Sequence, residues 1–332
     1  MAYNPKLNVY ILRLKPVNDS VQTFRDLFKA KFCMDALKSD DDVFEEYFKR
    51  FVNEIGNDKF RKDNKNKKVL GVANDSILPI LPHESTYIDG VIEGGKFGIL
   101  REYADTDKKE EKTIIGANNA VLDKYYILLY TPLNSEYGFL LVQSYTEESV
   151  QDSLRDFIRV FFSCDNMFYN AVIEPFVPEK LQERYMNNAS VRMFSFSTKT
   201  GVSEILRNDI QIQGQTFEVE IKVKPIDSTL KPDTEETNRI YEELTEKSFD
   251  GVKLRDCRNK KIYVKDTNDR NTHYDIEKEI KNIKPTIYLE DEGITIDDKT
   301  GLPDFAKIKE FCEKVLEEVL EEFDKKSNIN EY

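Results

Sequence analysis

Two nearly continuous apolar runs in the first half of the chain predict strands at the centre of a sheet. They are KYYILLYTP at 124–132 and YGFLLVQSY at 137–145, joined by the short segment LNSE. A strand covered on both faces has this composition, whereas a strand with one wet face alternates apolar and polar residues. The segment LNVYILRLKP at 7–16 predicts a further strand, which Pro16 ends.

Apolar residues spaced by three and four positions predict four amphipathic helices, at 21–32, 41–55, 147–162 and 303–327. Asp19 or Ser20 would cap the first helix, and Thr146 the third. The expected buried stripe of the third helix consists of Val150, Leu154, Phe157, Ile158 and Phe161. That of the last helix consists of Phe305, Ile308, Cys312, Val315, Val319 and Phe323.

The segment 87–103, YIDGVIEGGKFGILREY, predicts two strands joined at Gly94–Gly95, because paired glycines favour a two-residue hairpin turn. Part of it, GVIEGGKF at 90–97, has the glycine and lysine spacing of a phosphate-binding loop. Phe97 stands where such a loop needs a serine or threonine to hold magnesium, and the next residues predict a strand in place of a helix. We therefore expect no nucleotide site here.

Beyond about residue 168 the pattern changes to short alternating strands, such as VRMFSFST at 191–198 and TFEVEIKVKP at 216–225. We expect an α+β fold with two domains, 1–167 and 168–332, each a mixed or mostly antiparallel sheet with packed helices. The helix at 303–327 would cap the second domain, and its pairing with a second copy of the chain is the alternative.

The 332-residue chain is acidic, with a formal net charge of −13, so only a local basic patch would let it contact nucleic acid. Its four cysteines, Cys33, Cys164, Cys257 and Cys312, are far apart and predict free buried thiols in a reducing compartment. The two histidines, His83 and His273, are expected at the surface. We predict no metal site and no cofactor.

The N-terminal segment has no apolar region typical of a leader peptide, and no run approaches the roughly 18 apolar residues that a membrane span needs. We therefore expect a cytoplasmic protein without membrane contact.

One dense basic cluster interrupts the acidic sequence, between residues 59 and 68. It consists of Lys59, Arg61, Lys62, Lys65, Lys67 and Lys68. The segment has no apolar periodicity, so we expect a mobile loop. A local group of cations is what contact with a phosphate backbone requires, and these six residues are the candidate nucleic-acid contacts.

A second group of charged residues is compatible with a metal-dependent nuclease site. Asp209 is followed by Glu218, Glu220 and Lys222 on an expected strand. An acid followed by Glu-x-Lys is the arrangement of many magnesium-dependent nucleases, in which carboxylates hold the metal and the lysine stabilises charge. The same alternation is also typical of a half-buried strand with one solvated face. Both interpretations remain open at this point.

Three segments of the second half together resemble a known family. They are VIEPFVPEKLQERYMNNASVRMFSFST at 172–198, TFEVEIKVKP at 216–225 and SFDGVKLRDCRNKKIYV at 248–264. Their order and spacing are similar to those of the RexA-type phage-exclusion proteins and related abortive-infection defence proteins. The resemblance implies a two-domain cytoplasmic protein that binds DNA with little sequence preference and forms a homodimer.

Three functions follow as hypotheses. The first is a sensor or effector of an antiviral system that binds DNA or a phage protein and has no catalytic residues. The second is a metal-dependent nuclease that uses Asp209, Glu220 and Lys222. The third is an interaction subunit of a defence complex, whose partner is encoded nearby and is contacted by the helix at 303–327.

Overall fold

The computed structural model describes residues 4–16, 23–76, 78–164, 171–201, 216–226, 230–232, 234–249, 252–266, 268, 270–275 and 286–329. The chain divides into two compact units, one formed by Met1–Phe176 with Thr286–Tyr332 and the other by Val177–Pro285. The fold class is α+β, as expected. The division differs from the expected domains, 1–167 and 168–332, because the C-terminal segment returns to the first unit.

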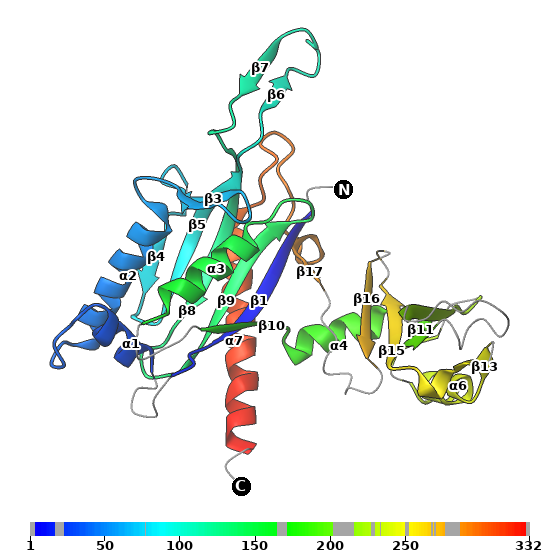
Figure 1. The fold of residues 1–332 in the computed structure, drawn as a ribbon. Coiled ribbons are helices and arrows are strands. Elements are labelled where there is room, and N and C mark those ends of the chain that lie inside the picture. Colours follow the sequence, from blue (N-terminus) through cyan, green and yellow to red (C-terminus); the bar gives the residue numbers. More distant parts are fainter. Residues whose placement is uncertain are drawn as a thin grey trace. The chain divides into compact units, whose positions relative to one another are not determined.

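The first unit is built on one antiparallel sheet (Figure 1). Its strands follow the order β10 (Val172–Phe176), β1 (Pro5–Arg13), β9 (Tyr137–Tyr145), β8 (Val121–Tyr130), β5 (Tyr87–Lys96), β3 (Lys68–Val72) and β2 (Arg61–Asp63). Two short strands complete it, β17 (Ile287–Tyr288) beside β1 and β4 (Leu81–His83) beside β5. Strands β8 and β9 lie in the middle, so the prediction from the two apolar runs is confirmed.

Three helices cover one face of this sheet (Figure 1): α1 (Phe24–Lys31), α2 (Asp40–Gly56) and α3 (Gln151–Phe161). Aromatic rings fill the space beneath them, and the Phe28 and Tyr47 rings stack with centroids 4.2 Å apart. The stripe predicted for the third helix is buried, as expected. The helix itself begins at Gln151, four residues later than expected, and the Thr146 hydroxyl donates to the Asn4 carbonyl instead of capping it.

The opposite face of the sheet is covered by α7 (Phe305–Ile329), which lies against β5, β8 and β9. Four of its predicted stripe residues are fully buried: Ile308, Cys312, Val315 and Val319. Further along the helix, the Phe323 ring lies 5.1 Å from that of Tyr137 and 5.8 Å from that of Phe139. The helix expected to cap the second domain therefore closes the core of the first unit.

The turn predicted at Gly94–Gly95 is absent, and β5 runs through both glycines between β3 and β8. A Cβ at Gly94 would lie 2.5 Å from the Val69 carbonyl oxygen, and one at Gly95 would lie 1.7 Å from that of Val121. The glycines thus serve close strand packing, which the sequence alone does not separate from a turn. The hairpin of this region is formed instead by β6 (Arg101–Ala104) and β7 (Lys112–Ile115), which extend beyond the end of β5 (Figure 1).

The second unit contains a four-stranded antiparallel sheet. Its order is β12 (Thr216–Val223), β11 (Ser190–Gly201), β15 (Asn259–Lys265) and β16 (Asn271–Asp275). Its described residues also form α4 (Glu179–Asn188), α6 (Glu235–Thr245), the short strands β13 (Ser248–Phe249) and β14 (Val252–Lys253), and the 3-10 helix η1 (Leu254–Asp256). The side chains of Phe194, Phe196, Ile262 and Val264 form its core. The alternating strands predicted here are confirmed.

None of the helices in the described part of the chain combines the length and apolar character that crossing a membrane needs.

Candidate nucleic-acid interface

The basic segment 59–68 forms an ordered hairpin at the edge of the large sheet, where a mobile loop was expected. Strands β2 and β3 pair with Arg61 opposite Leu70, Lys62 opposite Val69, and Asp63 opposite Lys68. The expectation was wrong because β2 has only three residues, none of which is apolar, so the sequence shows no strand pattern. The hairpin is stabilised by contacts with residues that lie far away in the sequence.

Asp63 holds the turn of this hairpin. Its carboxylate accepts hydrogen bonds from the backbone N–H groups of Lys65 and Asn66, both at 3.0 Å, and from the Asn66 side chain at 2.7 Å. The Ser153 hydroxyl of α3 donates to the same group at 2.6 Å. Desolvation acts to raise the pKa of Asp63, but these donors outweigh it and hold the pKa below its usual value. The turn is thus fixed to α3.

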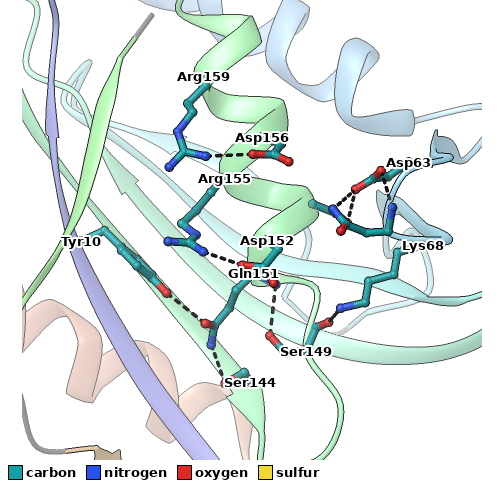
Figure 2. A network of polar contacts seen from close by, with 12 residues as sticks. Tyr10, Asp63, Lys68, Ser144, Ser149, Gln151, Asp152, Arg155, Asp156 and Arg159 are labelled. Carbon is teal, nitrogen blue, oxygen red and sulfur yellow. Dashed lines mark hydrogen bonds and ion pairs between the residues drawn. The ribbon is translucent and has the colours of Figure 1, made fainter. Parts of the chain in front are cut away.

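Strand alternation divides the cations between the two faces of the sheet. Arg61 lies opposite Leu70, on the side covered by α3, and its guanidinium stands 4.9 Å from the centroid of the Phe157 ring. Lys68 reaches the same side and donates to the Ser149 carbonyl at 2.5 Å, as Figure 2 shows. These two cations hold the hairpin to the unit and are already engaged within it.

The contacts that position Ser149 lie at the start of α3 (Figure 2). The Tyr10 hydroxyl donates to Gln151 Oε1 at 2.9 Å, and Gln151 Nε2 donates to the Ser144 hydroxyl at 2.7 Å. The Gln151 backbone N–H donates to the Ser149 hydroxyl at 3.1 Å. The loop that receives Lys68 is therefore itself anchored to the central strands.

Lys62 and Lys67 lie on the other face of the sheet, around the ring of Phe97. Each ammonium nitrogen is 5.9 Å from the centroid of that ring. The Phe97 backbone N–H donates to the Lys67 carbonyl at 3.0 Å, which continues the pairing of β3 and β5 by one residue. Lys59 and Lys65 are exposed at the two ends of the hairpin. The structure thus brings four of the six predicted contacts to exposed positions.

Among the described residues, none of the six cations forms an ion pair with a carboxylate. Neighbouring cations behave differently: Lys96 lies 2.8 Å from Glu148, and Arg159 lies 2.8 Å from Asp156 (Figure 2). Asp63 is the single acidic residue between positions 59 and 68. The hairpin therefore keeps a local positive charge on an acidic protein.

The residues of the nuclease hypothesis are only partly described. Glu220 and Lys222 form an ion pair of 2.8 Å on β12, and the Ser195 hydroxyl donates to Glu220 at 2.7 Å. The hydrogen bond from Lys222 is the main cause that lowers the pKa of Glu220. Asp209 lies outside the described residues. Within the described chain, no group of three His, Cys, Asp or Glu side chains is placed to hold a metal ion.

A buried cluster beneath α7 was missed from the sequence. Asp89 of β5 accepts hydrogen bonds from His83 at 2.5 Å, from the Tyr126 hydroxyl at 2.6 Å and from Lys309 of α7 at 2.8 Å. The Tyr87 hydroxyl adds a hydrogen bond to Glu313 of α7 at 3.1 Å. His83, expected at the surface, has a side chain only 27% exposed and belongs to this cluster.

Both oxygens of the Asp89 carboxylate are engaged, so the cluster acts as an anchor for α7. Desolvation is the main cause that raises the pKa of the Tyr126 hydroxyl and of the neighbouring Cys312 thiol. A lone aspartate between Ile88 and Gly90 gives no periodic signal, and its partner on α7, Lys309, is 220 residues away.

The four cysteines are free, as expected, but only Cys257 and Cys312 are buried, while Cys164 is half-buried and Cys33 is exposed.

Comparison of the chain with protein-family models, with curated proteins and with solved structures gave no match.

Proposed function

We propose that this protein binds nucleic acid without chemistry of its own, through the phosphate backbone and the β2–β3 hairpin. The observation that carries the proposal is the placement of Lys62 and Lys67, which have no carboxylate partner among the described residues and flank a partly exposed aromatic ring. Lys59 and Lys65 extend the same charge along the edge of the sheet.

The physical basis is the release of counterions. Each lysine that meets a phosphate displaces condensed cations, so binding is favoured at low salt and needs no base-specific contact. The net charge of −13 opposes the approach of polyanions to the protein as a whole. Binding therefore needs a local group of cations, and Asp63 with the contacts of Arg61 and Lys68 holds the hairpin in one conformation.

The biological setting that we propose is an antiviral system of the abortive-infection type. The support is the resemblance of residues 172–264 to phage-exclusion proteins, together with the binding surface on the first unit. A homodimer and a partner protein encoded nearby belong to the same proposal. The other contact surface considered for a partner protein, the apolar stripe of α7, is largely buried within the first unit.

Equilibrium binding to a labelled oligonucleotide tests the proposal. We compare the wild-type protein with the Lys62→Gln/Lys67→Gln variant and with a control, Lys38→Gln/Lys314→Gln, whose two exposed lysines lie elsewhere and give the same change in net charge. The hairpin variant should bind at least about tenfold more weakly at moderate salt, and the control should match the wild type. Equal affinity of both variants would disprove the proposal.

A second assay tests the setting. Bacteria that express the wild-type chain with its neighbouring genes should form fewer phage plaques than cells with the Lys62→Gln/Lys67→Gln variant. Equal plaque numbers for the two strains, despite weaker binding in vitro, would contradict the defence role while leaving nucleic-acid binding intact.

A further inference from the structure

We propose that the interface selects single-stranded nucleic acid over duplex, because one unpaired base stacks on the Phe97 ring. This inference rests on the proposed function and names its substrate class. Its core is an aromatic side chain at the end of β5 with two ammonium nitrogens over its ring, each 5.9 Å from the ring centroid.

Phe97 is held in place by backbone contacts on both sides. Its own N–H donates to the Lys67 carbonyl at 3.0 Å, and the N–H of Gly98 donates to the Ala117 carbonyl at 2.8 Å. Gly98 has a φ of +91°, a conformation that favours glycine, so the chain turns away directly after the ring. The ring therefore stays partly exposed at the end of β5 and does not enter the core.

The surroundings of the ring match the chemistry of a nucleotide. Lys62 of β2 and Lys67 of the β2–β3 turn hold their ammonium groups over the ring, and both are exposed side chains that can turn to meet the phosphates of a stacked base. Ile99 and Leu100 follow the ring with 61% and 63% of their surfaces exposed, and they offer apolar contact to the next base or sugar. An aromatic platform with flanking cations is the arrangement that binds single strands without reading their sequence.

A duplex does not supply the same contacts. Its bases are stacked on one another, so an aromatic ring on a protein surface reaches their faces only after a base is unstacked, which costs a few kcal/mol. The lysines can still meet the phosphates of a duplex. Duplex binding should therefore depend on Lys62 and Lys67 but not on Phe97.

The charge around the Phe97 ring favours a nucleic acid over a protein as the bound partner. The exposed β6–β7 hairpin carries its own cross-strand ion pair, Lys112 with Glu102 at 2.8 Å, and is close to neutral. Around Phe97, by contrast, two cations lie without a carboxylate partner in the described chain. That local charge complements a polyanion.

A single tryptophan gives a direct readout, because the natural chain contains none. In the Phe97→Trp variant, titration with a single-stranded oligonucleotide should quench the indole fluorescence, and the duplex of the same sequence should leave it nearly unchanged at equal saturation. The matched control is Leu81→Trp, since Leu81 is 48% exposed on β4 and pairs with Asp89, toward the opposite end of β5 from Phe97. Its fluorescence should not respond to either ligand.

Affinity measurements complete the test. Loss of one stacked base is worth about 1–3 kcal/mol, so Phe97→Leu should bind a single strand about 5- to 150-fold more weakly and a duplex as the wild type does. Phe97→Tyr should restore single-strand affinity. Equal losses for both ligands, or no loss together with unquenched Phe97→Trp, would overturn the stacking proposal.

The lysine variant and the Phe97 variants together distinguish a failure of base stacking from a failure of backbone binding. If Lys62→Gln/Lys67→Gln weakens binding while every Phe97 variant binds like the wild type, backbone binding stands and base stacking is wrong. If the lysine variant also binds like the wild type, both are wrong.

Discussion

Lys309 of α7 lies 2.8 Å from Oδ2 of Asp89, whose side chain is only 4% exposed on β5. This pair joins two elements that are 220 positions apart in the sequence. Substitution of Asp89 by Asn should destabilise the protein by about 3 kcal/mol, because the half-buried Lys309 ammonium group then loses its nearer counter-charge and keeps only Glu313, at 3.6 Å. The midpoint and slope of urea-induced unfolding measure this loss.

A control and a coupling test accompany this prediction. Lys314→Ala, at an exposed position of the same helix, should change the free energy of unfolding by less than about 0.5 kcal/mol. The double variant Asp89→Asn/Lys309→Met should lose less than the sum of the single variants, since the two side chains interact directly. Strict additivity would show that the pair does not anchor α7.

The turn of the hairpin should weaken in acid. Because hydrogen bonds hold the pKa of Asp63 below its usual value of about 3.8, the folded state favours the ionised carboxylate. Its contribution is complete above that usual value and is lost as the pH falls through the lower folded-state pKa. Asp63→Ala should therefore cost about 1–2 kcal/mol at neutral pH and much less in strong acid. Unfolding curves of both proteins across this pH range measure the difference, and a pH-independent cost would contradict the assignment.

Substitutions on the two faces of the hairpin should have different effects: one face should affect stability, and the other should affect nucleic-acid affinity. Arg61→Ala removes the contact with Phe157 and should cost about 0.5–1 kcal/mol of stability with little effect on nucleic-acid affinity. Lys62→Gln should show the reverse pattern. Thermal unfolding and equilibrium binding on the same preparations give both quantities. Equal losses of affinity for the two variants would show that the faces do not divide the cations as described.

The cysteines should differ in reactivity according to their burial. Cys33 is exposed, whereas Cys312 is buried and desolvation raises the pKa of its thiol. A maleimide reagent at neutral pH should label Cys33 within minutes and leave Cys312 unmodified until urea unfolds the protein. Peptide mapping by mass spectrometry identifies the labelled residue, and early labelling of Cys312 would show that α7 opens readily.

Local patterns predicted the elements that carry strong apolar signals. The runs that became β8 and β9 and the stripe of α3 follow directly from burial on two faces or on one face. The start of α3 could not be predicted, because Glu148 is taken by an ion pair with Lys96 and Thr146 by Asn4. Both are contacts between distant segments.

The candidate site was found in the sequence as a charge cluster but not as a shape. Six cations in ten residues were visible, yet the division into an engaged pair and an exposed group depends on strand pairing with Val69 and Leu70. From the sequence alone, Phe97 is only the residue that departs from the pattern of a phosphate-binding loop. Its proposed role in the interface depends on the register of β3 and β5, which places it beside Lys67.

The central claim is that unpaired lysines of the β2–β3 hairpin meet phosphates, and its most direct test is the salt dependence of binding. The logarithm of the affinity for a single strand should fall linearly with the logarithm of the salt concentration, with a slope of about −0.7 for each phosphate contact. Lys62→Gln/Lys67→Gln should reduce the magnitude of this slope by about 1.4, while Lys38→Gln/Lys314→Gln leaves it unchanged. An identical slope for the wild type and the hairpin variant would contradict the claim.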